Sequence, residues 1–186
     1  ELMNGLKAKG FSIMLGVPTY WRERRNDALP DAKLYDLIKA ADVIMPWFVG
    51  RFGNDNYSNF HSLVENDIKW CKENKVEYAP LCFPGSSDRN MHPNNGINSR
   101  VGGKFLWNQM YHCIKSGAQL LYIAMFDEID EGTAIFKCAK KVPVGASTFV
   151  PIEEGIGSDH YLWLVGQAGK MLRKEKPLEM KQPERK

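Results

Sequence analysis

Short apolar runs alternate with helix-like segments along most of the chain, and this alternation limits the fold more than any other feature. The apolar runs predict strands at residues 11–17, 42–49, 76–83 and 118–126, with a weaker strand at 148–151. Apolar residues three and four positions apart predict helices at residues 1–10, 33–41, 60–74 and 105–115, and one that begins near Ser158. An alternation with a period of roughly 35 residues is typical of parallel βαβ units.

Four or five βα units are too few for a closed (β/α)₈ barrel, which usually needs about 250 residues. Two folds remain possible: an open α/β sheet and the C-terminal half of such a barrel. The strands end in aromatic, arginine, glycine or acidic residues, and no glycine-rich phosphate loop follows the first strand. Functional residues spread over several strand ends are typical of barrels. We therefore expect an α/β fold in which residues 1–175 form the C-terminal half of a (β/α)₈ TIM-type barrel and residues 176–186 form a flexible tail.

Composition excludes several classes of partner. A net charge of +3 over 186 residues is too small to indicate a nucleic-acid-binding protein. No apolar run approaches the roughly 18 residues that a membrane span needs, so we expect no membrane partner. Because the chain opens without an initiator methionine, we expect a fragment or processed piece. The compartment is therefore unknown from the sequence.

The four cysteines are widely separated, and no cysteine or histidine pair has the spacing of zinc ligands. This density is far below that of a disulfide-stabilised scaffold, so we expect buried free thiols. The sequence predicts no metal and no cofactor.

A cluster of acids follows the last long apolar run. Within residues 118–133, Asp127, Glu128, Asp130 and Glu131 come directly after an uncharged segment. Ligands of α/β proteins bind beyond the carboxyl ends of the strands. The acids are therefore expected at the mouth of a binding site.

Acid–base catalysis is one interpretation of this cluster. On a helical turn, residues three apart, such as Glu128 and Glu131, share one face at about 5–6 Å between Cβ atoms. Retaining glycosidases need two carboxyl groups about 5–5.5 Å apart, one protonated and one ionised. Crowding of four acids raises the pKa of at least one. Two other interpretations remain open: acids that merely favour a helix start, and a divalent-metal site.

Other strand ends carry residues suited to a sugar. Flat apolar faces stack on pyranose rings, and charged or amide groups bind the hydroxyls. The candidate substrate-binding residues are Trp21, Arg22, Trp47, Arg51, Tyr57, Asp88, Asp127 and Asp130. The competing interpretation for an aromatic residue such as Trp47 is a place in the core.

The acidic stretch at 126–133, Phe-Asp-Glu-Ile-Asp-Glu-Gly-Thr, resembles the Asn-Glu-Trp-His-Glu-Gly-Thr stretch of glycoside hydrolase family 99, the endo-acting α-mannosidases and mannanases. It is still more similar to the group described as glycoside hydrolase family 71/99-like. Segments similar to that group also occur at 16–22 (Gly-Val-Pro-Thr-Tyr-Trp-Arg), 46–51 (Pro-Trp-Phe-Val-Gly-Arg) and 83–85 (Phe-Pro-Gly). The resemblance thus covers most of the chain, in order.

The resemblance implies a (β/α)₈ barrel and a glycoside hydrolase. By position, it implies that Glu128 assists the 2-hydroxyl of the sugar as this attacks the anomeric carbon, and that Glu131 acts as general acid and then base. Asp127, Ile129 and Asp130 stand where family 99 has Asn, Trp and His, so the resemblance leaves the sugar open. It also suggests a periplasmic or secreted protein.

The expected partners are a carbohydrate substrate and either the missing N-terminal half of the barrel or a second copy of the chain. A half-barrel exposes strand edges and apolar interior, which favours such association. Two alternative functions are a carbohydrate-binding pseudo-enzyme on the same scaffold and a metal-dependent hydrolase that uses Asp127, Glu128 and Asp130.

Overall fold

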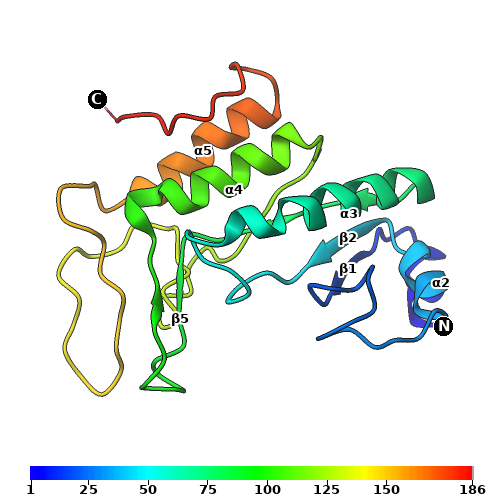
Figure 1. Cartoon of the computed structure of the whole chain (residues 1–186), viewed down its shortest axis with the longest axis horizontal. Coiled ribbons are helices and arrows are strands. Elements are labelled where there is room, and N and C mark those ends of the chain that lie inside the picture. The colour runs from blue at the N-terminus through cyan, green and yellow to red at the C-terminus, as the bar shows by residue number, and fades with distance from the viewer. Residues whose placement is uncertain (186) are drawn as a thin grey trace.

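Helices cover one side of a set of short parallel strands, and loops project from the other side (Figure 1). The computed structural model describes residues 1–185. The helices are α1 (Leu2–Lys7), α2 (Leu34–Lys39), α3 (His61–Asn74), α4 (Lys104–Lys115) and α5 (His160–Leu172), with 3₁₀ turns η1 (Tyr57–Phe60) and η2 (Val101–Gly103). The strands are β1 (Met14–Val17), β2 (Val43–Pro46), β3 (Glu77–Tyr78), β4 (Leu81–Cys82), β5 (Ser86–Ser87), β6 (Ile97–Asn98) and β7 (Tyr122–Ile123).

The parallel strands confirm an α/β fold. One sheet has the order β1-β2-β3, and β4 pairs with β7, all in parallel. Between β3 and β4, the Ala79 N–H donates to the Ile44 carbonyl, whereas the Pro80 carbonyl accepts from the Tyr122 N–H. The predicted strand at 76–83 is thus divided: its first part pairs with β2 and its second part with β7. Pro80, which has no N–H, stands at the division.

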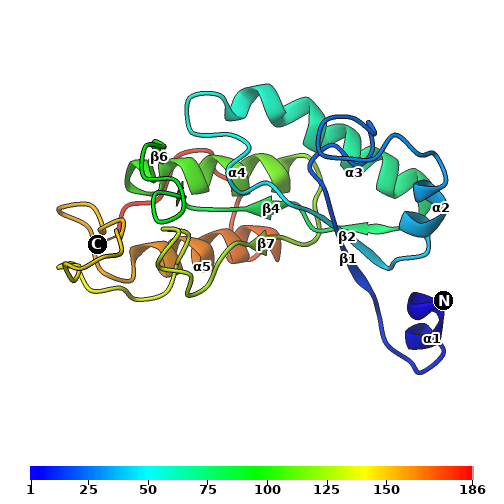
Figure 2. The same cartoon turned by 90° about the horizontal axis from the view of Figure 1, so that it is seen from below.

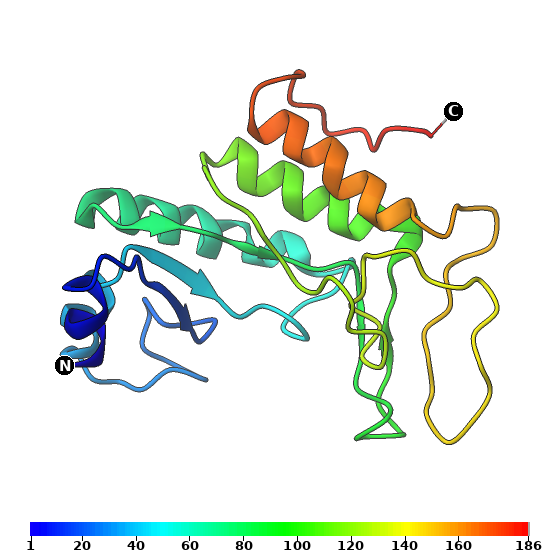
Figure 3. The same cartoon turned by 180° about the vertical axis from the view of Figure 1, so that it is seen from behind.

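Two other predicted elements differ from the structure. The weak strand predicted at 148–151 is absent from the described residues, because Thr148 makes its backbone hydrogen bonds with the Asn90 side chain instead of with a strand. The segment at 88–103, for which no helix or strand is predicted, includes part of an antiparallel hairpin, in which Ser86 pairs with Asn98 and Ser87 with Ile97. Seen from behind, the hairpin and the long loop before α5 project from the face opposite α4 and α5 (Figure 3).

The core lies between the strands and the helices α3, α4 and α5. Ile44 of β2 and Val64 of α3 are buried, as are Trp107 of α4 and Leu164 of α5. Helices α4 and α5 lie side by side, whereas α1 projects away from the main body at the N-terminal end (Figure 2). The four cysteines are free, and Cys71, Cys82 and Cys113 are buried.

The segment predicted as a flexible tail is packed against the helices. The indole N–H of Trp107 donates to the Met180 carbonyl at 3.1 Å, and the Gln182 side chain donates to the Gly102 carbonyl at 2.9 Å. Arg185 forms an ion pair with Asp159 at the start of α5. Residues 176–185 are therefore part of the folded unit. Among residues 1–185, no helix combines the length and the apolar character that crossing a lipid bilayer requires.

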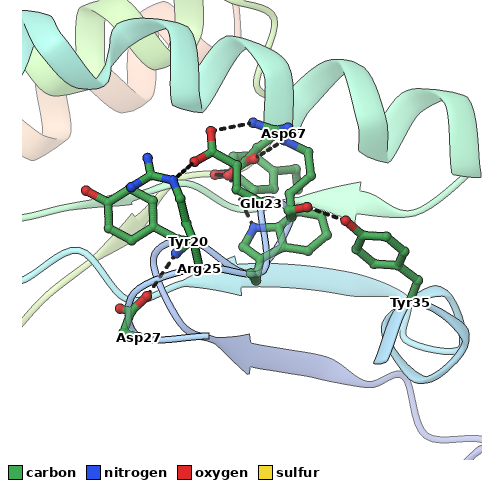
Figure 4. A network of polar contacts seen from close by, with 9 residues as sticks. Tyr20, Glu23, Arg25, Asp27, Tyr35 and Asp67 are labelled. Atoms are coloured by element: carbon green, nitrogen blue, oxygen red, sulfur yellow. Dashed lines mark hydrogen bonds and ion pairs between the residues drawn. The ribbon is translucent and has the colours of Figure 1, made fainter. Parts of the chain in front are cut away.

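A buried carboxylate joins α3 to the segment that leaves β1 (Figure 4). Asp67 accepts hydrogen bonds from the Trp21 indole N–H at 3.2 Å, the Arg22 Nε at 2.7 Å and the Tyr78 hydroxyl at 3.0 Å. Burial raises the pKa of Asp67 to about 6, although Arg22 and the other donors lower it. The folded state therefore binds this proton more tightly than the unfolded chain, and stability falls as the pH rises through this range.

Replacement of Arg22 tests this network. Arg22→Met leaves the Asp67 carboxylate buried without its cation, and we expect the free energy of unfolding to fall by about 3 kcal/mol at about pH 8. Because Asp67 takes up a proton more easily at about pH 5, the loss should be smaller there. Urea unfolding at both pH values measures the difference. Arg25→Met, which removes an exposed arginine from the same segment, is the control. A loss that does not depend on pH contradicts this account of Asp67.

Candidate active site

A cavity of about 640 Å³ opens where the chain leaves β2 and β4. Its walls include Trp47 and Arg51 after β2, Asp88 after β5, Asn98 of β6, and Glu131 from the acidic stretch. Three of the predicted substrate-binding residues and one predicted catalytic glutamate thus line one cavity. Its volume lies in the usual range for small-ligand sites, about 300–1,000 Å³.

The segment after β2 supplies the cavity wall with both an apolar and a charged side chain. Trp47 is 39% exposed and offers an apolar face. The Arg51 guanidinium forms an ion pair with Asp27 at 3.0 Å. Burial alone would raise the pKa of Asp27, but hydrogen bonds from the backbone N–H groups of Tyr20 and Thr19, together with Arg51, hold it below its ordinary value. Asp27 therefore stays ionised and fixes Arg51 at the cavity edge.

Glu131 is the acid of the cluster that the structure places in the cavity wall. Partial burial is the largest cause that raises the pKa of Glu131 above its ordinary value. The negative charges of Glu128, Asp130 and Asp88 raise it further, in that order. A carboxyl group with a raised pKa is a suitable proton donor near neutral pH.

The acidic stretch forms a turn and not a helix. The Gly132 N–H donates to the Ile129 carbonyl at 3.2 Å, and Gly132 has a φ of +67°. The helical turn on which the spacing of Glu128 and Glu131 was interpreted is therefore absent from this stretch. Glu128 instead accepts a hydrogen bond from the buried Thr133 hydroxyl at 2.8 Å, and it is not among the residues found in the cavity wall within the described chain.

Two predicted sugar-binding aromatic residues are core residues instead. Trp21 is 2% exposed because its indole bonds to Asp67, and Tyr57 is 4% exposed with its hydroxyl 3.1 Å from His112 Nδ1. Arg22 is occupied by its ion pair with Asp67. These three predicted substrate-binding residues do not line the cavity in the described part of the chain.

The remaining acids, Asp127 and Asp130, are exposed and do not line the cavity in the part of the chain described here. Within residues 1–185, no three side chains of His, Cys, Asp or Glu come together in a way that would hold a metal ion. Asp127, Glu128 and Asp130 therefore do not form the metal site that the hydrolase alternative needs.

The residues that hold the turn in place could not be predicted from the sequence. The Ser87 N–H donates to the Glu131 carbonyl at 2.6 Å, and the Asn90 side chain donates to the Asp130 carbonyl at 2.9 Å. Arg100 donates to the Gly132 carbonyl at 2.7 and 3.1 Å. These residues lie 32 or more positions away along the chain, and no local pattern indicates such pairings.

The substitution Gly132→Ala tests the close packing of the turn against Val150. A Cβ atom on this residue would lie 2.7 Å from Val150 Cγ2, whereas Gly155 has a similar positive φ but open space around it. We expect Gly155→Ala to lower the free energy of unfolding by about 1–2 kcal/mol through backbone strain alone. Gly132→Ala should cost more, and Val150→Ala in the same chain should recover the excess. Equal losses at the two glycines in denaturant titrations would contradict the close contact.

A glycoprotein endo-α-1,2-mannosidase of Mus musculus is 30% identical to the chain over 87 residues, which are 46% of this chain and 19% of the mouse protein. No protein-family model matches the chain.

Two solved structures of the family 99 endo-α-mannosidase from Bacteroides thetaiotaomicron have a similar fold. The complex with bis-tris-propane gives a TM-score of 0.63 at 24% identity, over 77% of this chain and 45% of the enzyme. The second structure gives 0.64 at 23% identity, over 78% and 42%. The chain thus spans less than half the length of each of these proteins. From the sequence match and the shared fold together, the chain is related to the endo-α-mannosidases of glycoside hydrolase family 99.

Proposed function

We propose that the chain is the catalytic part, or half, of a glycoside hydrolase, with Glu131 as proton donor and Glu128 as its carboxyl partner. The observation that carries this proposal is the position of Glu131. Its carboxyl group lines a cavity of ligand size and has a raised pKa.

Glycoside cleavage needs one protonated and one ionised carboxyl group on either side of the scissile bond. The raised pKa favours the protonated form of Glu131, which is the form that donates to the leaving oxygen. The Thr133 hydroxyl fixes Glu128 by donating to its carboxylate. The charge of Glu128 is also one of the causes that raise the pKa of Glu131.

The other cavity residues suit a sugar. Trp47 supplies an apolar face for the C–H side of a pyranose, and Arg51 and Asp88 supply a donor and an acceptor for hydroxyl groups. The names of the relatives suggest α-mannosides as the first substrates to test. Because Ile129 and Asp130 replace the Trp and His of family 99, the test panel should also include other hexosides.

We propose further that the parallel strands are the C-terminal half of a (β/α)₈ barrel. β1 pairs on one side only, with β2, among the described strands, and Met14 on it is exposed. An unpaired edge of this kind is a site for further strands. These would come from the N-terminal half of the barrel or from a second copy of the chain.

A second candidate is a carbohydrate-binding protein without hydrolytic activity. The observation that favours it is the side chain of Glu128, which bonds to Thr133 and is not found in the described wall of the cavity. Binding of saccharides to the chain with no hydrolysis product would support this candidate.

Glu131→Gln tests the catalytic assignment. The amide cannot donate a proton as the acid does, so we expect kcat for glycan cleavage to fall by about 10²- to 10⁴-fold with little change in saccharide binding. Product release is measured by chromatography of labelled glycans. Glu154→Gln, which changes an exposed glutamate in the long loop before α5, is the control. Unchanged turnover in Glu131→Gln would remove Glu131 from the mechanism.

Asp88→Asn tests the cause of the raised pKa. The charge of Asp88 raises the pKa of Glu131, so its removal should lower that pKa. The protonated acid is then lost at lower pH, and the alkaline limb of the kcat–pH profile should move to lower pH. Asp36→Asn, an exposed acid on α2, should leave the limb in place. A limb that stays fixed, or moves to higher pH, in Asp88→Asn contradicts the assignment.

A further inference from the structure

The acidic turn is held in place by hydrogen bonds to three of its consecutive backbone carbonyl groups. The carbonyls of Asp130, Glu131 and Gly132 accept hydrogen bonds from Asn90, Ser87 and Arg100, in that order. All three donors belong to residues 87–100, which include most of the β5–β6 hairpin. The hairpin therefore fixes the turn through its backbone and leaves the acidic side chains free.

Arg100 differs from the other two donors in its charge and burial. It is 3% exposed, and no carboxylate forms an ion pair with it among residues 1–185. Its Nε and Nη2 both donate to the Gly132 carbonyl. Its Nη1 has no hydrogen-bond partner in the described part of the chain. Its guanidinium carbon lies 4.8 Å from the centre of the Tyr161 ring.

Burial of a guanidinium without an acidic partner is costly, and an aliphatic side chain would fill the same space at lower cost. The chain also makes room for Arg100. A Cβ atom on Gly85 would lie 2.8 Å from Arg100 Cγ and 2.6 Å from the Asn98 carbonyl oxygen. Stability alone does not account for this arrangement. The contact that sets Arg100 apart is the pair of hydrogen bonds to the residue that follows Glu131.

We propose that Arg100 is a positioning residue for Glu131: by holding the Gly132 carbonyl with two donors, it keeps the Glu131 carboxyl group in the wall of the cavity. This inference rests on the proposed function, in which Glu131 is the catalytic acid that Arg100 positions. Gly132 has the positive φ at which the chain reverses, so the direction of its carbonyl sets the direction of the turn.

Two roles for Arg100 predict opposite results. A through-space positive charge would lower the pKa of Glu131, so removal of Arg100 would raise it. A positioning role predicts the reverse. When the turn is released, the Glu131 carboxyl group leaves its partly buried place and moves away from Asp88, and its pKa falls toward the ordinary value of a glutamate.

The experiment is an NMR titration of the chain labelled with ¹³C at the glutamate carboxyl groups, with the Glu131 signal identified by its loss in Glu131→Gln. We expect the pKa of Glu131 to fall in Arg100→Met, and to fall by less in Arg100→Lys, which keeps the charge but not the two-donor fork. The amide hydrogen of Ser87 should exchange about tenfold faster in Arg100→Met. Arg89→Met is the matched control, since Arg89 also donates to a carbonyl of the same segment, that of Asn95, outside the turn.

A Glu131 pKa that is unchanged or higher in Arg100→Met overturns the proposal. If Arg100→Met does not fold, Arg100→Lys decides, and a pKa equal to or above that of the unmodified chain overturns it. The titration needs no turnover, so the two proposals fail separately. A Glu131 pKa that responds to Arg100 without cleavage of any glycan removes only the proposed function. If glycan cleavage depends on Glu131 but the pKa of Glu131 is unchanged in the Arg100 variants, only the positioning role is removed.

Discussion

The parallel pairing of β4 with β7 is the interaction on which the candidate site depends. Leu81 lies opposite Tyr122, and the pairing continues with a hydrogen bond from the Ala124 N–H to the Cys82 carbonyl. Because the two strands run in the same direction, the segments that leave them emerge at the same edge. One segment leads to Asp88 and the other to Glu131. A short ladder thus brings together residues more than 40 positions apart in the sequence.

In the candidate site, backbone carbonyl groups make the structural contacts of the acidic turn, and the acidic side chains remain available for chemistry. Hydrogen bonds from the β5–β6 hairpin end on carbonyl groups of the turn, so the carboxylates of Asp130 and Glu131 are not consumed by structural contacts. Four acids in five positions would repel one another in any arrangement. Asp127 and Asp130 are exposed, whereas Glu131 is partly buried. This burial, together with the charges of Glu128, Asp130 and Asp88, favours the protonated form of Glu131.

Sequence patterns predicted the helices well because each helix has a strong apolar face. The helices predicted at 33–41, 60–74 and 105–115 lie within two residues of α2, α3 and α4 at each end. The strands are shorter than their apolar runs, since ladder hydrogen bonds depend on partners far along the chain. Pro80 shows this: the sequence gives a proline inside an apolar run, and only the structure shows that the pairing changes sides there.

The acidic cluster and its place at a strand end could also be predicted, but the direction of each side chain could not. Trp21 and Trp47 both follow an apolar strand in the sequence, yet Asp67 of α3 draws the first into the core and the second lines the cavity. Glu128 and Glu131 have the spacing of a helical face, but the stretch that carries them forms a turn that ends at Gly132. These differences arise from long-range hydrogen bonds, which no local pattern reports.

The central claim is that this cavity binds a carbohydrate. The most direct test is an NMR titration in which a panel of oligosaccharides is added and the indole N–H signals of the tryptophans are followed. The account predicts that the signal of Trp47 shifts with saturation for at least one saccharide, while the signals of Trp21 and Trp107, whose indoles bond to Asp67 and to the Met180 carbonyl, stay in place. A Trp47 signal that no saccharide moves, or a shift of the buried indoles alone, would contradict it.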